Sequence, residues 1–362
     1  MLNRLLSHDL PRNRWLALVL VLIVLGLALT PFIFPGTKAL NVSAKIIVFI
    51  VLAASFDLLL GYTGIVSFAH TMFFGIGAYG IAVASTRLGP GWGALALGVA
   101  GALALSTVLS VVIGLFSLRV RAIFFAMITL AVASAFLTLA SQLSDFTGGE
   151  DGLTFKVPEA LQPGTAYLEQ PLFGASVDGR FATYYGLFFV ALALVSLLLR
   201  IVNSPFGRVL QAIRENDFRA EAIGYRTVVY RTLASVISAL FATLAGVLLA
   251  LWLRYTGPDT TLSFEIMLDV LLIVVIGGMG TVYGAVIGSV LLVLAQNYLQ
   301  DLMKLASSQI ELAVAGVPIV SQLVSPDRWL LWLGILFVLS VYHFPSGVVG
   351  RLRAMRAPER KP

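Results

Sequence analysis

Three ionisable residues lie inside long apolar stretches of this chain: Asp57, His70 and Asp269. A charged group is costly in a bilayer, so such residues usually face the protein interior or a wet cavity. Asp57 lies four residues before Gly61, which favours a structural bond to a nearby turn. Asp269 follows Glu265 by one helical turn and is compatible with a place close to the outer surface. These scattered groups form no proton-relay chain, which argues against proton-coupled transport.

His70 is the strongest candidate to face a polar cavity, because Ser67 and Thr71 stand beside it among aromatic residues. A histidine whose hydrogen bonds are satisfied by packing inside the protein is an equally good interpretation. The other histidines, His8 and His343, are far away in the sequence, and the chain has no cysteine. We therefore expect no metal site.

The sequence also lacks the signatures of an enzyme. It has no GxxxxGK[ST] phosphate loop, no GxSxG or HExxH motif and no clustered carboxylates. We therefore predict a chain with no catalytic residue, no bound cofactor and no ATP-hydrolysing site of its own.

Composition places the chain in a membrane. Hydrophobic residues make up 59% of the 362 positions and charged residues only 12%, and the mean hydropathy is +0.96. A soluble surface of this size needs far more charge. The 24 basic residues against 18 acidic ones do not indicate nucleic-acid binding, because the excess falls in short segments between apolar runs.

Ten apolar stretches have about the length that crosses the hydrocarbon core as a helix. The third and eighth are interrupted by glycine, so eight to ten crossings are predicted. The first is a retained helix, because no small-x-small cleavage site precedes Pro31. The predicted fold class is an all-α polytopic membrane protein. The stretches are 15–34, 45–60, 66–86, 92–117, 122–142, 183–200, 232–253, 264–282, 284–300 and 329–344.

Charge orients these crossings. Residues 200–231 carry a net +3 and the tail a net +4, whereas 143–182 carry a net −4. Because basic segments stay in the cytoplasm, ten crossings place both termini inside and 143–182 outside. The predicted organisation is a cytoplasmic segment 1–14, a transmembrane domain 15–350 with external segments 143–182 and 301–327 and a cytoplasmic loop 203–231, and a basic tail 351–362.

The two loops differ in kind. In the external loop the stretch 172–180 (LFGASVDGR) is similar to a hairpin, and the loop is either a spacer or a docking surface for an external partner. In 203–231, Ser204 can cap a helix that has Pro205 at its first position, and a second helical turn stops at Gly224. Mixed charges and capping signals favour a folded docking element over a basic loop held by anionic lipid.

Two glycine-rich segments stand in opposite halves of the chain. Glycine permits close helix approach and also unwound backbone, which at membrane depth must be buried in protein or line a wet cavity. Paired interruptions point to a translocation path, although tight packing explains any single glycine better. We assign to the path or its immediate support Gly61, Tyr62, Gly64, Ser67, His70, Gly75, Gly77, Gly277, Gly278 and Gly280.

Four ordered motifs resemble the branched-chain amino acid (LIV-type) ABC permease family over about residues 40–350. They are LLLGYTGIVSFAHTMFFGIGAYG, PFGRVLQAIRENDFRAEAIGY, GPDTTLSFEIMLDVLLIVVIGGMGTVYGAVIGS and FPSGVVGR. Within that family the chain looks like the longer of two paired permeases of the bacterial inner membrane.

The resemblance implies partners: a companion permease, two ATPase subunits that use ATP and Mg, and a periplasmic solute-binding protein. It implies a heterodimer of permeases, with a homodimer as the alternative. The implied solutes are branched-chain or related small amino acids, with urea, short amides or aromatic acids as alternatives. The resemblance also implies a coupling helix that docks on the ATPase. The residues that it assigns to this helix are Arg214, Glu215, Asp217, Arg219, Glu221 and Gly224.

Two other classes compete with this interpretation. An ion-coupled secondary transporter needs several coupling-ion ligands at mid-membrane depth, and the sequence offers almost none. A membrane enzyme that acts on lipid needs a polar catalytic cluster at headgroup level, and no such cluster is evident.

Overall fold

The structure is a computed structural model that describes residues 14–34, 36–117, 122–168, 176–313, 328–344 and 346–354. Within those ranges nine helical stretches are long and apolar enough to cross a membrane. The predicted all-α polytopic membrane protein is therefore confirmed. Nearly all of the predicted terminal segments 1–14 and 351–362 lies outside the described residues.

The first half of the chain ends in an irregular loop, and the second half begins with a long helix. The elements of the first half are α2 (Arg14–Ile33), α3 (Thr37–Thr63), α4 (His70–Leu88), α5 (Trp92–Ser117), α6 (Ala122–Gln142), α7 (Ser144–Thr147), η1 (Gly149–Asp151), β1 (Leu153–Thr154) and η2 (Glu159–Leu161). The second half comprises α8 (Gly179–Val202), α9 (Pro205–Glu215), α10 (Asp217–Ala222), α11 (Thr227–Leu253), β2 (Tyr255–Thr256), α12 (Pro258–Thr261), α13 (Phe264–Gly277), α14 (Val282–Ala313), α16 (Trp329–His343) and α17 (Gly347–Ala354).

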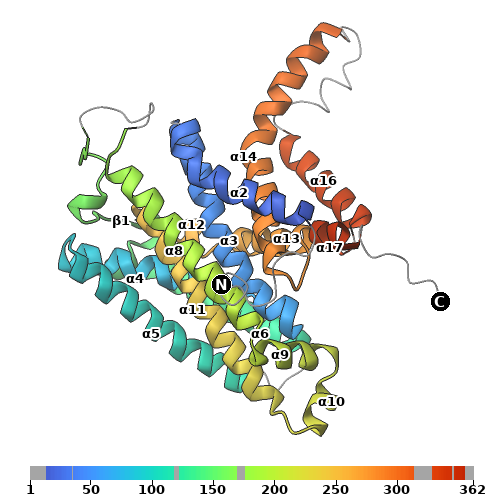
Figure 1. The fold of residues 1–362 in the computed structure, drawn as a ribbon. Coiled ribbons are helices and arrows are strands. Elements are labelled where there is room, and N and C mark those ends of the chain that lie inside the picture. Colours follow the sequence, from blue (N-terminus) through green and yellow to red (C-terminus); the bar gives the residue numbers. More distant parts are fainter. Residues whose placement is uncertain are drawn as a thin grey trace.

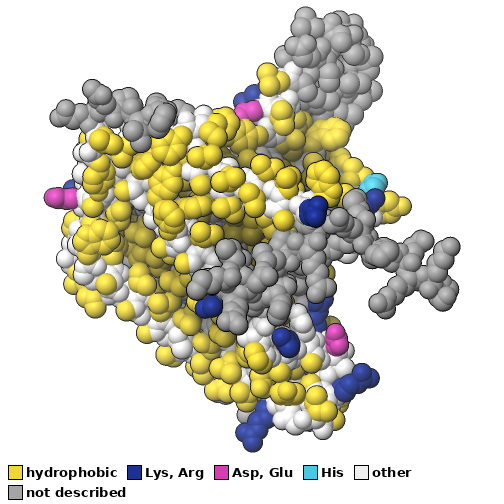
Figure 2. Space-filling model, viewed as in Figure 1, with side chains coloured by type: hydrophobic (Ala, Val, Ile, Leu, Met, Phe, Trp, Pro, Cys, Tyr) yellow, Lys and Arg dark blue, Asp and Glu magenta, His cyan; other side chains and the backbone are white. Residues whose placement is uncertain are grey.

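The helix α3 is the buried centre of the bundle. In its most apolar window 94% of the residues are buried, against 17% in α2 and 12% in α16. The helices α8, α11, α13 and α14 pack around α3, and α4 and α5 pack on α11 (Figure 1). Figure 2 shows that hydrophobic side chains cover most of the described surface on the face in view, as contact with lipid requires.

Helix boundaries differ from the predicted ones at two places that matter. The helix α3 begins at Thr37 rather than at residue 45, so Lys45 lies two turns inside it. The helix α14 continues to Ala313, so the predicted external segment 301–327 begins as helix, and residues 314–327 lie outside the described ranges.

The break expected within the third predicted crossing, 66–86, lies at its start instead, and α4 runs unbroken through Gly75, Gly77 and Gly80. The helix α3 ends at Gly64 in the left-handed conformation (φ 72°), and a non-helical stretch, 64–69, leads back into the bundle before α4 begins. The backbone N–H of Phe68 donates to Oγ1 of Thr129 in α6 (3.1 Å). Ile65, Ser67 and Ala69 are buried, so this unwound backbone lies within protein rather than against lipid.

The loop after α6 folds against the far end of α11. Strand β1 pairs antiparallel with β2, which follows α11, and a further bridge joins Ala166 to Asp178. Asp178 belongs to the predicted hairpin 172–180, of which residues 172–175 lie outside the described residues. This loop and the α9–α10 pair lie at opposite ends of α11 (Figure 1).

Glycine sets the distance between α4 and α11. A Cβ at Gly77 would overlap the Thr243 carbonyl oxygen, and one at Gly246 would overlap the Phe74 carbonyl oxygen. We predict that Gly77→Ile destabilises the fold by about 1–3 kcal/mol or more, since neither backbone can give way. The matched control is Gly26→Ile in α2, where a Cβ meets nothing within 4 Å.

Size-exclusion profiles and thermal unfolding of the two variants in detergent measure this difference. Equal profiles for both variants would contradict the close approach of α4 and α11.

Candidate functional site: a glycine joint beneath two short helices

The predicted docking element consists of the two short helices α9 and α10. Asn216 ends α9 and caps α10, because its side-chain oxygen accepts from the backbone N–H of Arg219 (2.9 Å). Gly224 follows with a positive φ of 97°. The two predicted helices are confirmed. Ser204 occupies the N-cap position of α9, but its hydroxyl donates to the carbonyl of Ile201 (2.6 Å) instead of capping the new helix.

The helix α9 is held by one apolar face. Leu210 and Ile213 are buried, and the ring of Phe206 stacks on Tyr230 of α11 at 5.8 Å between centroids. The helix contacts α3, α8 and α11. It is therefore packed into the bundle and cannot shift without moving its neighbours.

Arg214, in the last turn of α9, contacts the end of α3 directly. Its Nη1 donates to the carbonyl oxygen of Gly61. Carbonyl groups in the last turn of a helix have no partner within the helix, and a cation is favourable there. The contact therefore stabilises the α3 terminus and fixes α9 upon it.

Gly61 also contacts the turn between α13 and α14. A Cβ at Gly61 would overlap the backbone of Gly280, and one at Gly280 would meet Nη1 of Arg214 and the Gly61 carbonyl at 3.1 Å. The buried carboxylate of Asp57 accepts the backbone N–H of Gly280 at 2.8 Å. We call Gly61 and the turn Gly277–Gly280, with Asp57 and Arg214, the glycine joint.

The joint extends to the last described helix. A Cβ at Gly347, at the start of α17, would overlap the backbone of Gly278, and one at Gly277 would overlap the carbonyl of Gly284. Gly278 and Gly280 have positive φ values of 117° and 78°, a conformation that favours glycine. The two glycine-rich segments of the sequence thus meet, and α3, α9, α13, α14 and α17 converge on them.

The remaining predicted path residues pack between helices. His70 is buried and its Nε2 lies 2.7 Å from Oγ of Ser238, whose hydroxyl in turn donates to the Ser55 carbonyl. The His70 ring packs edge-on against Phe56 at 5.0 Å. Tyr62 and Ser67 are buried, and Gly75 faces Leu262. These contacts explain the residue types by close packing, and their part in a solute path stays a prediction.

The predicted coupling residues divide into two groups. Two acids bind α11: Oδ2 of Asp217 lies 3.4 Å from Nη2 of Arg231, and Oε1 of Glu221 accepts from Oγ1 of Thr227 at 2.5 Å. Glu215 and Arg219 are exposed. Asp217 and Glu221 therefore hold α10 to α11, whereas Glu215 and Arg219 project outward.

Sequence reasoning missed two exposed hydrophobic side chains on this element. Phe218 is 83% exposed and Ile223 69% exposed. Both stand in a charged, extramembrane segment, and that contrast is the signal that could have identified them.

It also missed Lys45 and Gln296, which lie beside Asp269. Lys45 stood at the edge of a predicted crossing and therefore attracted no notice, whereas the earlier start of α3 places it within the helix.

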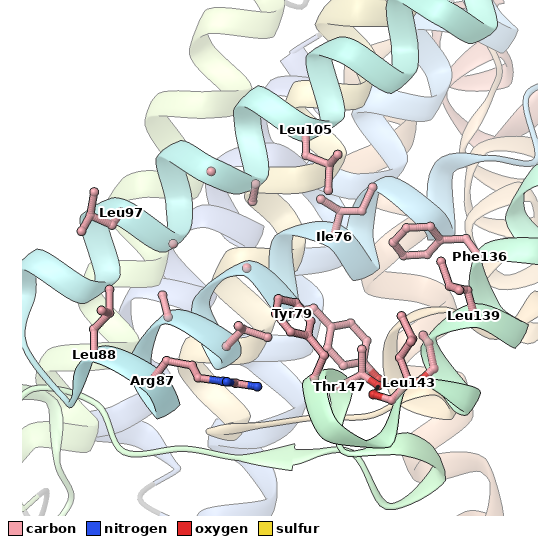
Figure 3. Close-up of a pocket in the computed structure, with 18 residues that line it drawn as sticks. Ile76, Tyr79, Arg87, Leu88, Leu97, Leu105, Phe136, Leu139, Leu143 and Thr147 are labelled. Atoms are coloured by element: carbon pink, nitrogen blue, oxygen red, sulfur yellow. Dashed lines mark hydrogen bonds between the residues drawn. The ribbon is translucent and has the colours of Figure 1, made fainter.

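A large groove of about 570 Å³ lies between α4, α5 and α6 (Figure 3). Its lining is almost wholly apolar, with Ile76 and Tyr79 from α4, Leu105 from α5 and Phe136 from α6. Its charged lining residue, Arg87, donates to the Asp145 carbonyl at 2.8 Å. Such a lining suits hydrocarbon and offers a charged solute few hydrogen-bond partners.

Within the described residues, no group of three or more His, Cys, Asp or Glu side chains could hold a metal ion. The arrangement can transmit movement, because α9, which lies outside the membrane spans, contacts the glycine joint where α3, α13, α14 and α17 meet.

This arrangement defines a multi-pass membrane protein with an extramembrane element coupled to its buried core. A family model described as branched-chain amino acid transport system / permease component matches residues 38–339. The chain therefore belongs to that family of transport permeases.

Curated relatives agree with the family. The chain is 27% identical to the high-affinity branched-chain amino acid transport system permease protein LivM of Escherichia coli K12, over 78% of this chain and 68% of the relative. It is 25% identical to the probable LivM permease of Methanocaldococcus jannaschii, over 72% and 70%. The LivH permease of E. coli K12 is also 25% identical, over 68% and 79%. The chain is therefore of the LivM type. No solved structure matches it.

The Asp57 carboxylate generates a prediction about stability. We expect Asp57→Leu to lower the free energy of unfolding by about 1–3 kcal/mol, because the half-buried N–H of Gly280 loses its acceptor. Asp57→Asn keeps a side-chain oxygen in the same place and should cost less. Thermal unfolding in detergent compares the two, and an equal loss in both variants would contradict a role as hydrogen-bond acceptor.

Proposed function

We propose that this chain is a permease subunit of an ABC importer for branched-chain or related small amino acids. A periplasmic binding protein delivers the solute, and separate ATPase subunits drive the cycle. The observation that carries the proposal is the contact of Arg214 in α9 with the glycine joint. It links an extramembrane element directly to the centre of the membrane bundle.

The joint suits the transmission of force. The helix α9 is hydrogen-bonded to the end of α3 through Arg214, and Asp57 of α3 is hydrogen-bonded to the turn between α13 and α14. At the glycine contacts these backbones are packed so closely that there is no room for a Cβ between them. A displacement of α9 by an ATPase subunit therefore moves α3 together with α13 and α14, and such movement changes access to a path between paired permeases.

The docking surface for the ATPase subunit lies on α10. Phe218 and Ile223 project there beside the exposed Arg219. Apolar anchors with a charged rim are typical of protein interfaces.

Both ends of the described chain support the proposed orientation. Leu16 of α2 and Val349 of α17 pack together with Ile287 of α14. This cluster is close to the glycine joint, at the same end of the bundle as α9. We therefore propose that both termini and α9–α10 face the cytoplasm of a bacterial cell, with the protein in its inner membrane.

The similarity to both LivM and LivH supports a pair of related permeases. We propose a heterodimer, with a homodimer as the alternative. Urea, short amides or aromatic acids are the alternative solutes, and an ion-coupled transporter that works alone is the alternative class.

Gentle purification of the tagged chain from native membranes tests the class. Recovery of an ATPase subunit and a second permease, with ATP hydrolysis in the purified sample, is the expected result. A chain that is recovered alone in several mild detergents and takes up solute with an ion gradient would overturn the proposal.

Phe218 provides the matched test of the docking surface. We expect Phe218→Asp to lower recovery of the ATPase subunit about tenfold or more, because it removes an exposed aromatic anchor. Leu168→Asp, at a 51% exposed position in the opposite loop, should leave recovery unchanged. Both variants should unfold at the temperature of the unmodified protein, and unchanged recovery with Phe218→Asp would place docking elsewhere.

A further inference from the structure

A polar network joins three helices inside the membrane bundle. Gln296 of α14 donates from Nε2 to Oδ1 of Asp269 in α13 (2.7 Å). The Nζ of Lys45 in α3 lies 3.5 Å from Oε1 of the same glutamine. With a rise of 1.5 Å per residue, Lys45 lies about 12 Å into α3 and Gln296 about 21 Å into α14. The network therefore lies within the spans.

The charges of this network are held apart. The direct ion pairs among the described residues lie elsewhere, so an amide bridges the Lys45 ammonium and the Asp269 carboxylate. A lysine and an aspartate buried in a membrane usually pair with one another or face water. All three side chains are only partly buried. The Lys45 ammonium also lies over the Phe49 ring, 5.2 Å from its centroid, so its contacts are to an amide and a ring rather than to a carboxylate.

Glu265 adds a second acid. It is exposed and precedes Asp269 by one turn of α13. Two carboxylates against one ammonium leave the network one cation short. An α-amino acid supplies the missing ammonium and also a carboxylate that can pair with Lys45.

We propose that Lys45 and Asp269, with Glu265 beside them, form a transient binding site for an amino-acid zwitterion, and that Gln296 fills the space between the two charges when the site is empty. The inference rests on the proposed function and identifies solute contacts within it. Lys45 donates to the solute carboxylate, while Asp269 and Glu265 accept from its ammonium. Without solute the Gln296 amide lies between the two charged groups, and the solute displaces it. A neutral solute such as urea uses neither charge.

The competing explanation is that polar side chains only hold the three helices together. A purely structural network is closed to water, whereas a solute site must be reached by water and by the solute. Accessibility therefore separates the two explanations.

The absence of native cysteine makes accessibility measurable. Gln296→Cys places a thiol between two charges that remain intact. The complete transporter, with both permeases and its ATPase subunits, is placed in liposomes and treated with a charged methanethiosulfonate reagent. The matched control is Leu294→Cys on the same helix, which is 40% exposed and lines an apolar groove with α2 and α3.

We expect the reagent to modify the Gln296→Cys variant and not the Leu294→Cys variant. Leucine on both sides of the membrane should slow the reaction about threefold at twice its dissociation constant, as fractional occupancy requires. Leucinol lacks the carboxylate and 4-methylpentanoate lacks the ammonium, so neither should protect at the same concentration. Adding Lys45→Met to the Gln296→Cys variant should abolish protection by leucine.

The inference is overturned if the Gln296→Cys thiol does not react, if leucine fails to protect it, or if all three compounds protect it equally. ATP-driven leucine uptake by the unmodified transporter in the same liposomes tests the proposed function separately. ATP-driven uptake without protection of the thiol by leucine would contradict the inference alone. Lack of ATP-driven uptake would contradict the proposed function.

Discussion

The carboxylate of Asp57 accepts the backbone N–H of Gly280, and this one hydrogen bond joins two interrupted segments that are 223 residues apart. A bilayer core cannot satisfy unwound backbone, so each break in a crossing helix needs a partner within the protein. The chain meets this constraint at the α13–α14 turn by placing that turn against the last turns of α3, next to the first break. Glycine at both positions lets the backbones come close enough for the bond to form.

The same constraint connects the membrane bundle to the extramembrane helices. Because α3 ends at the joint, its last carbonyl groups need donors, and Arg214 of α9 supplies one. The acids of α10 bind Arg231 and Thr227 at the start of α11. The element is therefore tied to both central helices of the bundle. A docking surface on α10 is mechanically useful because of these ties, whatever solute the transporter carries.

Polarity divides the surface of the bundle into two kinds. The groove between α4, α5 and α6 is apolar and suits hydrocarbon, whereas Lys45, Glu265, Asp269 and Gln296 bring charge and amide groups to α3, α13 and α14. Charged groups at this depth are stable only where water, solute or a protein partner meets them. The proposed solute site lies on this second surface.

Local chemistry alone determined much of this protein. Apolar runs of membrane length, the Pro205 and Gly224 boundaries of the short helices and the glycine breaks are all readable from neighbouring residues, because hydrophobicity and turn geometry act locally. Only the tertiary structure decided which groups meet. Asp57 binds the distant Gly280 rather than its own turn, and His70 binds Ser238. The helix α3 begins before its apolar run, and Lys45 therefore lies inside the helix. There Gln296 links it to Asp269. Pairings between helices far apart in sequence depend on how those helices pack, and no local pattern encodes that.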